Sequence, residues 1–120
     1  MATVRIDVPA TAKRGEIIEI RTLIAHAMET GFRRTYLGVP VPRDIIKLFV
    51  CTYNGVEICR ADLHPSIAAN PYLSFSTIAT ESGTLVFNWS GDNGFTATES
   101  AAITVHSPAR NLSDSGSTNS

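Results

Sequence analysis

Apolar and polar side chains alternate along much of the chain, and short runs containing glycine, proline or asparagine interrupt the alternation. A period of two residues is typical of strands that bury one face. It predicts strands over residues 4–8, 16–25, 45–53, 56–63, 72–80, 85–90 and 95–105. About seven such strands favour an all-β, immunoglobulin-like sandwich of two antiparallel sheets, although a closed barrel gives a similar pattern.

The last two predicted strands indicate where the core lies. Leu85, Phe87 and Trp89 alternate with smaller or polar residues, so the three large side chains share one face and are expected in the core. In the segment 95–105, Glu99 falls on the face that is otherwise apolar. Its position there indicates a bulge, a sheet edge or a contact with a partner.

Asn54-Gly55 separates two strongly β-forming segments and predicts a hairpin. Both central residues of a type I′ turn need positive φ, which asparagine and glycine adopt most easily. In a regular two-residue hairpin Cys51 would face Ile58, and Cys59 would lie on the opposite side of the sheet. This register predicts poor geometry for a Cys51–Cys59 disulfide.

The alternation stops between residues 27 and 43, where glycines and prolines interrupt a stretch rich in arginine. We expect a long exposed connection there, and loops of this length usually carry a function. Its charged residues and their neighbours are Glu29, Arg33, Arg34, Arg43 and Asp44. The arginines would suit an anion, but a loop of mixed charge is more often simply solvated.

Composition limits the classes of function. With 120 residues, 43% hydrophobic and 18% charged, the chain has the balance of one domain, which we expect over residues 1–106, followed by a flexible polar tail over 107–120. A net charge of −1 argues against nucleic-acid binding. No apolar run approaches the ~20 residues of a membrane helix, and the first residues do not resemble a signal peptide. We expect neither nucleic acid nor membrane as a partner.

The motifs of common enzymes do not occur in the sequence, which has no glycine-rich phosphate loop, no Gly-x-Ser-x-Gly and no Cys-x-x-Cys. We expect no catalytic residue, no cofactor and no metal. One weaker alternative is a free-standing periplasmic sandwich that binds copper through His26, Met28 and His64, with His106 as a further histidine. The more ordinary interpretation places these histidines at strand ends as surface groups.

Cys51 and Cys59 are the two cysteines. Cys51 lies in an apolar run and is expected in the core. A reactive thiolate needs nearby cations or a helix N-terminus, and this run offers neither. Cys59 falls between Ile58 and Arg60 on the expected solvent face. There it would contact a partner or, as an alternative function, accept sulfur itself.

Several motifs occur in unbroken order between residues 4 and 105. They include His26-Ala27-Met28-Glu29-Thr30-Gly31, Pro42-Arg43, Phe49-Val50-Cys51-Thr52-Tyr53-Asn54-Gly55, Ala69-Asn70-Pro71-Tyr72-Leu73-Ser74-Phe75 and Phe87-Asn88-Trp89. Together they resemble the SoxZ family, one half of the SoxYZ sulfur-carrier protein of bacterial thiosulfate oxidation. The turn over residues 36–40, usually polar in that family, reads Tyr36-Leu37-Gly38-Val39-Pro40 here.

The resemblance implies a non-catalytic, immunoglobulin-like subunit that pairs with SoxY, whose flexible C-terminal arm carries the sulfur-binding cysteine. The sequence Gly-Gly-Cys-Gly-Gly that ends that arm does not occur here. The resemblance also implies export to the periplasm with the partner, a heterodimer or heterotetramer, and transient contact with the Sox cytochrome, hydrolase and sulfane dehydrogenase. The residues expected to contact partners are Met28, Glu29, Gly31, Arg33, Arg34, Pro42, Arg43, Cys59, Asn70, Pro71, Tyr72 and Glu99.

Overall fold

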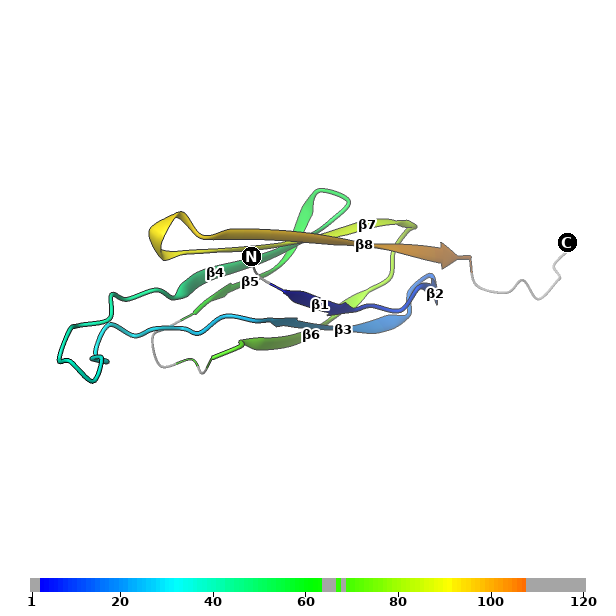
Figure 1. Cartoon of the computed structure of the whole chain (residues 1–120). Helices are drawn as coiled ribbons and strands as arrows, with labels where there is room; N and C mark the ends of the chain where they lie inside the picture. The colour runs from blue at the N-terminus through cyan, green and yellow to red at the C-terminus, as the bar shows by residue number, and fades with distance from the viewer. Residues whose placement is uncertain (1–2, 64–66, 68, 108–120) are drawn as a thin grey trace, which may run out of the picture.

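A computed structural model describes residues 3–63, 67 and 69–107, which form two packed β-sheets (Figure 1). The strands in this part of the chain are β1 (Val4–Asp7), β2 (Thr11–Lys13), β3 (Ile17–Ile24), β4 (Ile46–Tyr53), β5 (Val56–Asp62), β6 (Tyr72–Ile78), β7 (Gly83–Gly91) and β8 (Thr96–His106). One sheet has the order β1-β3-β6 and the other the order β2-β8-β7-β4-β5. The predicted all-β sandwich is confirmed, and the sheets do not close into a barrel.

The short strand β2 was missed by the sequence pattern. It pairs in parallel with residues 104–106 at the end of β8, whereas the other strand pairs of the described residues are antiparallel. Three residues are too few for an alternation to be recognised, and β2 forms because the edge of β8 offers it hydrogen bonds. The expectation of antiparallel strands alone is wrong at this edge.

Aromatic side chains fill the centre between the two sheets. The ring centroid of Phe49 in β4 lies 5.2 Å from that of Trp89 and 6.4 Å from that of Phe87, both in β7. Leu85, Phe87 and Trp89 are all buried, so the predicted core face of β7 is confirmed. Ile20 of β3 is also fully buried, in the opposite sheet. Each such side chain stabilises the fold by about 1.5–3 kcal/mol.

The hairpin between β4 and β5 turns at Asn54 and Gly55, whose φ angles of 49° and 83° are both positive, as the predicted type I′ turn requires. The register then skips Ile58, and Cys51 lies opposite Cys59. The expectation that Cys51 faces Ile58 is therefore wrong. One extra residue in β5 forms a bulge, which brings Cys59 to the core side instead of the solvent side.

Helical structure in the described residues is limited to the short 3-10 turn η1 (Asp92–Gly94). No helix in this part of the chain is long and apolar enough to cross a membrane. The predicted polar tail, apart from Ser107, lies outside the described residues.

Candidate partner-binding site

The long connection between β3 and β4 folds back on itself and extends beyond the end of the sandwich (Figure 1). Its two sides are joined by reciprocal backbone hydrogen bonds between Glu29 and Asp44, with N···O distances of 2.9 and 2.8 Å. Nearer the tip, the N–H of Thr35 donates to the carbonyl of Val39 at 2.8 Å. The predicted exposed connection therefore has internal order. We call residues 29–44 the projecting hairpin and residues 32–39 its tip. Its root is the set of residues that join it to the sandwich, around Met28 on one side and residues 43–46 on the other.

Met28 anchors the first side of the root in the core. Its side chain is 4% exposed, and its φ of 56° turns the chain from β3 toward the hairpin. The Met28 sulfur accepts a hydrogen bond from the N–H of Ile46 at 3.3 Å, which joins the entry of the hairpin to its exit. Burial of a methionine side chain contributes about 1.5–3 kcal/mol. This contact fixes the point at which the hairpin leaves the sandwich.

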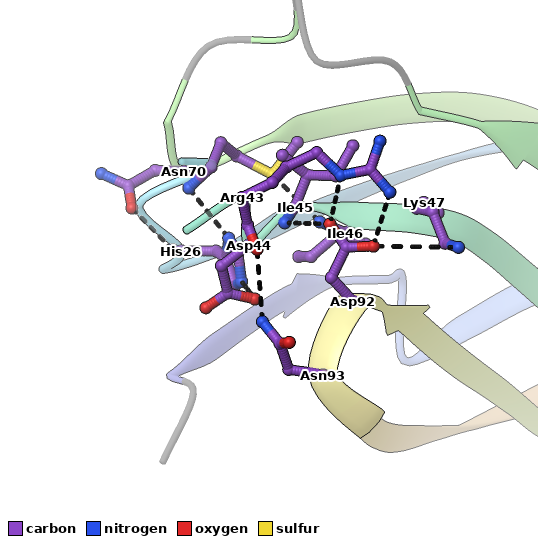
Figure 2. A network of polar contacts seen from close by, with 10 residues as sticks. His26, Arg43, Asp44, Ile45, Ile46, Lys47, Asn70, Asp92 and Asn93 are labelled. Atoms are coloured by element: carbon purple, nitrogen blue, oxygen red, sulfur yellow. Dashed lines mark hydrogen bonds and ion pairs between the residues drawn. The ribbon is translucent and has the colours of Figure 1, made fainter. Parts of the chain in front are cut away.

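His26 and Asn70 tie the root to the segment before β6 (Figure 2). The N–H of His26 donates to Asn70 Oδ1 at 2.9 Å, and the N–H of Asn70 donates to the His26 carbonyl at 2.7 Å. The His26 ring packs edge-on against Phe95, with centroids 4.9 Å apart. Its Nδ1 accepts the N–H of Met28 at 3.0 Å, so this nitrogen carries no proton. The imidazole thus holds the root in shape.

Asp92 holds the other side of the root (Figure 2). Its carboxylate accepts two hydrogen bonds from the guanidinium of Arg43, at 2.8 and 2.9 Å, and one from the N–H of Ile45 at 3.1 Å. Lys47 lies 3.8 Å from the same carboxylate. The bonds from Arg43, then the bond from Ile45 and the two positive charges, lower the pKa of Asp92 below its usual value. Because Asp92 directly follows β7, the turn after β7 also fixes the start of β4.

The arginines of the hairpin are bound to other groups of the chain. Arg33 donates to both carboxylate oxygens of Glu29, at 3.0 and 2.8 Å, and these bonds lower the pKa of Glu29. Arg34 donates to a backbone carbonyl near the tip at 3.0 Å. Since Arg43 binds Asp92, each arginine of the segment has a partner within the chain. This arrangement does not favour the anion site considered from the sequence.

Large apolar side chains of the projecting hairpin face solvent. They are Phe32, Tyr36, Leu37 and Val39, with exposed fractions of 89, 96, 73 and 55%. Single exposed apolar residues are ordinary, but four large ones within residues 32–39 favour contact of this segment with another molecule. Sequence reasoning selected the charged residues of this segment and missed these side chains. The signal that could have found them was the apolar turn over residues 36–40.

The residues predicted to contact partners mostly gather around the hairpin. Met28, Glu29, Gly31, Arg33, Arg34, Pro42 and Arg43 lie in it or at its root, and Asn70, Pro71 and Tyr72 lie in the segment joined to the root and at the start of β6. Cys59 of β5 and Glu99 of β8 lie apart from this group. The register of β8 with β7 is continuous at Glu99, while β2 covers only residues 104–106. Of the interpretations offered for Glu99, the structure thus excludes a bulge and places it at a sheet edge.

Within the described residues, the copper candidates His26 and Met28 are not arranged as a shared metal site. Strand β3 ends at Ile24, so His26 and Met28 do not share a strand face. His26 Nδ1 and the Met28 sulfur already accept backbone hydrogen bonds, and His64 lies outside the described residues. In residues 3–63, 67 and 69–107, no group of three or more His, Cys, Asp or Glu is placed to hold a metal ion.

Solved structures with a similar fold include proteins of different function. A superoxide reductase (neelaredoxin) from Ignicoccus hospitalis is similar with a TM-score of 0.66 and 18% identity, over 87% of this chain and 80% of that one. The sulfur carrier protein SoxY from Chlorobium limicola is similar with a TM-score of 0.61 and 11% identity, over 85% of this chain and 77% of that one. At these identities the likeness establishes the sandwich fold alone.

A comparison with curated proteins finds no match to the chain. The family model of the sulphur oxidation protein SoxZ, in contrast, matches residues 4–102. The matched range includes the projecting hairpin, its root and every strand except the end of β8. The chain therefore belongs to the SoxZ family, and its function lies in the Sox system of sulfur oxidation.

Proposed function

We propose that this chain is the non-catalytic subunit of a heterodimeric SoxYZ carrier. It binds a SoxY-type subunit, which holds sulfur intermediates on its own cysteine, and it helps to present them to the enzymes of thiosulfate oxidation. The projecting hairpin is the docking element for that subunit. The observation that carries the proposal is the combination of a firmly held root with an exposed apolar tip.

The tip supplies the contact surface. Phe32 and Tyr36 are almost fully exposed, and aromatic side chains are enriched among the residues that dominate binding energy in interfaces. Each aromatic side chain of this kind buries about 150–250 Å² when it is covered. The hairpin backbone is already hydrogen-bonded to itself, so docking would lose little conformational entropy. These properties suit an element that inserts into a partner.

The two thiols support a carrier cysteine on the partner. Burial, with a smaller contribution from Cys59, raises the pKa of Cys51 to about 12. Burial and the negative charge of Glu57 raise the pKa of Cys59. The thiolate is the reactive form in sulfur transfer, and both environments disfavour it at neutral pH. Neither thiol is therefore suited to rapid sulfur transfer at neutral pH.

We place the complex in the periplasm, where this chain arrives together with its partner. SoxY from Chlorobium limicola has the same sandwich fold, so the proposed heterodimer would consist of two sandwiches. A stable interface between them would bury about 1,600 Å² in total. The heterodimer, or a heterotetramer built from it, then contacts the Sox cytochrome, hydrolase and sulfane dehydrogenase transiently.

Co-expression and co-purification with a SoxY-type subunit tests the proposal. We expect a one-to-one complex with the wild-type chain. The double variant Phe32→Ser/Tyr36→Ser should weaken binding by at least about tenfold, because it removes two aromatic anchors. The matched control is Ile17→Ser/Ile78→Ser, which changes two exposed residues that pair with each other in the smaller sheet. The control should bind like the wild type.

Two results would contradict the proposal. A wild-type chain that does not bind the SoxY-type subunit excludes the heterodimer. Normal binding by the Phe32/Tyr36 variant, with loss of binding by the Ile17/Ile78 control, keeps the heterodimer but moves the docking surface from the projecting hairpin to the smaller sheet.

A further inference from the structure

The cysteines of the β4–β5 hairpin form a pair that the proposed function does not use. Cys51 and Cys59 lie directly opposite each other in antiparallel register. Opposite residues in such strands have Cα atoms about 4.5–5.5 Å apart. Disulfides span Cα distances of about 4.4–6.8 Å. The Cα spacing typical of such a pair therefore falls within the range that a disulfide spans.

We propose that Cys51 and Cys59 are a dithiol site, which an external disulfide oxidises to an intramolecular, cross-strand disulfide. The inference is independent of the proposed function, since it needs only this chain and an oxidant.

The bulge in β5 makes the site possible. In a regular hairpin Ile58 would pair with Cys51, and the two cysteines would point to opposite sides of the sheet; the bulge leaves Ile58 unpaired instead. With it, Cys51 is fully buried and Cys59 is half-buried against the same core. Both thiols are free in the structure. Formation of a single S–S bond between them would therefore link β4 to β5.

A small movement is needed to close the bond. The Cβ atoms of opposite residues are about 4.5–5.5 Å apart, whereas a disulfide requires about 3.5–4.5 Å. Strand β5 is the edge of its sheet, and β4 is its neighbour in that sheet. It can therefore approach β4 at Cys59 without breaking a second set of strand hydrogen bonds.

The oxidant needs to reach only Cys59. The Cys59 thiolate attacks one sulfur of the external disulfide, whose S–S bond breaks to form a mixed disulfide and release one thiolate. The Cys51 thiolate then attacks the sulfur of Cys59 and releases the second thiolate. The two released thiolates take up the two protons given by the protein. The protein is oxidised by two electrons, and the external disulfide is reduced to two thiols.

The environment of the thiols sets the rate. Burial and Glu57 raise the pKa of Cys59, so its thiolate is scarce near neutral pH, and the first step accelerates as pH rises. The second step is intramolecular, and the closeness of Cys51 compensates for its small thiolate fraction. The bond forms slowly and, once closed, is shielded by the core on the side of Cys51.

Oxidation of the reduced, full-length chain with oxidised glutathione tests the proposal. Samples are taken at roughly pH 7 and pH 9, alkylated in denaturant and measured as intact masses. We expect a product that carries neither the alkyl group nor glutathione, and a cross-link between the peptides of Cys51 and Cys59. The rate at the higher pH should be at least about tenfold greater.

Two variants separate the steps. Cys51→Ala should keep one glutathione on Cys59, because the resolving thiol is missing. Cys59→Ala should leave Cys51 unmodified in the folded chain, because Cys51 is fully buried. The second variant changes an edge position and keeps the test valid if Cys51→Ala fails to fold. Stable glutathione on the wild type, a disulfide-linked dimer, or no reaction at either pH would overturn the proposal.

Discussion

The root and the tip of the projecting hairpin are built in opposite ways. The root combines a buried Met28 with a carboxylate, Asp92, that accepts three hydrogen bonds from the returning chain. The tip leaves Phe32 and Tyr36 in solvent. The attachment of this segment to the sandwich therefore comes from the root, while backbone hydrogen bonds order the hairpin itself. Stability and recognition are assigned to different residues of one loop.

The largest effect that separates root from tip is expected for Met28→Ala. Removing this buried side chain should lower the free energy of unfolding by about 2–5 kcal/mol. Phe32→Ala is the matched change at the tip, where an exposed side chain contributes within about 0.5 kcal/mol. Denaturant unfolding measures both. If the two variants lost equal stability, the tip would be part of the core and the comparison would fail.

Two glycines sharpen the comparison at the level of the backbone. Gly31 has a φ of 92°, and a Cβ there would lie 3.1 Å from the Cβ of Arg43. Gly38 has a φ of 83°, and a Cβ there meets nothing within 4 Å. Gly31→Ala should therefore cost about 2 kcal/mol, for strain and crowding together, and Gly38→Ala about 1 kcal/mol for strain alone.

Thermal or denaturant unfolding of the two alanine variants side by side gives this difference directly. A larger loss for Gly38→Ala than for Gly31→Ala would mean that the tip, rather than the root, is the tightly constrained end.

A smaller effect, visible mainly as a dependence on pH, is expected for Asp92→Asn. The pKa of Asp92 is lower in the folded chain than its ordinary value of 3.8, so its charge stabilises the fold above that pH. This stabilisation is lost as pH falls through the lowered pKa. The asparagine keeps an acceptor for the N–H of Ile45 but has no charge to lose.

Unfolding curves recorded from neutral pH to about pH 2 test this expectation. The wild type should be more stable than Asp92→Asn at neutral pH, and the difference should shrink in acid. Curves that stay parallel throughout would show that the charge of Asp92 does not hold the root.

Local patterns predicted the sandwich because the alternation of buried and exposed side chains along a strand can be read from neighbouring residues. The alternation of Phe87 and Trp89 with polar residues placed the core face of β7 correctly. The positive φ angles at Asn54 and Gly55 followed from residue type alone. These features need no knowledge of the rest of the chain.

The features that the sequence did not reveal depend on pairings between distant or irregular segments. The Arg43–Asp92 pair joins residues 49 positions apart, a separation that no local pattern reports. The bulge at Ile58 changed which side of the sheet Cys59 occupies. Side chains alternate between the two faces of a strand, so one unpaired residue reverses the face predicted for the residues beyond it. The charged residues selected from the sequence turned out to have partners within the chain, as Arg33 has in Glu29 and Arg43 has in Asp92.

The backbone bonds between Glu29 and Asp44 close the hairpin at its base, so both ends of the intervening segment are held next to each other whatever its sequence. Substitutions, deletions or insertions between these ends can alter what the molecule recognises while the sheets stay intact. The sandwich thus carries a surface loop that can vary independently of the core, and the range of partners can change without any change in the interior.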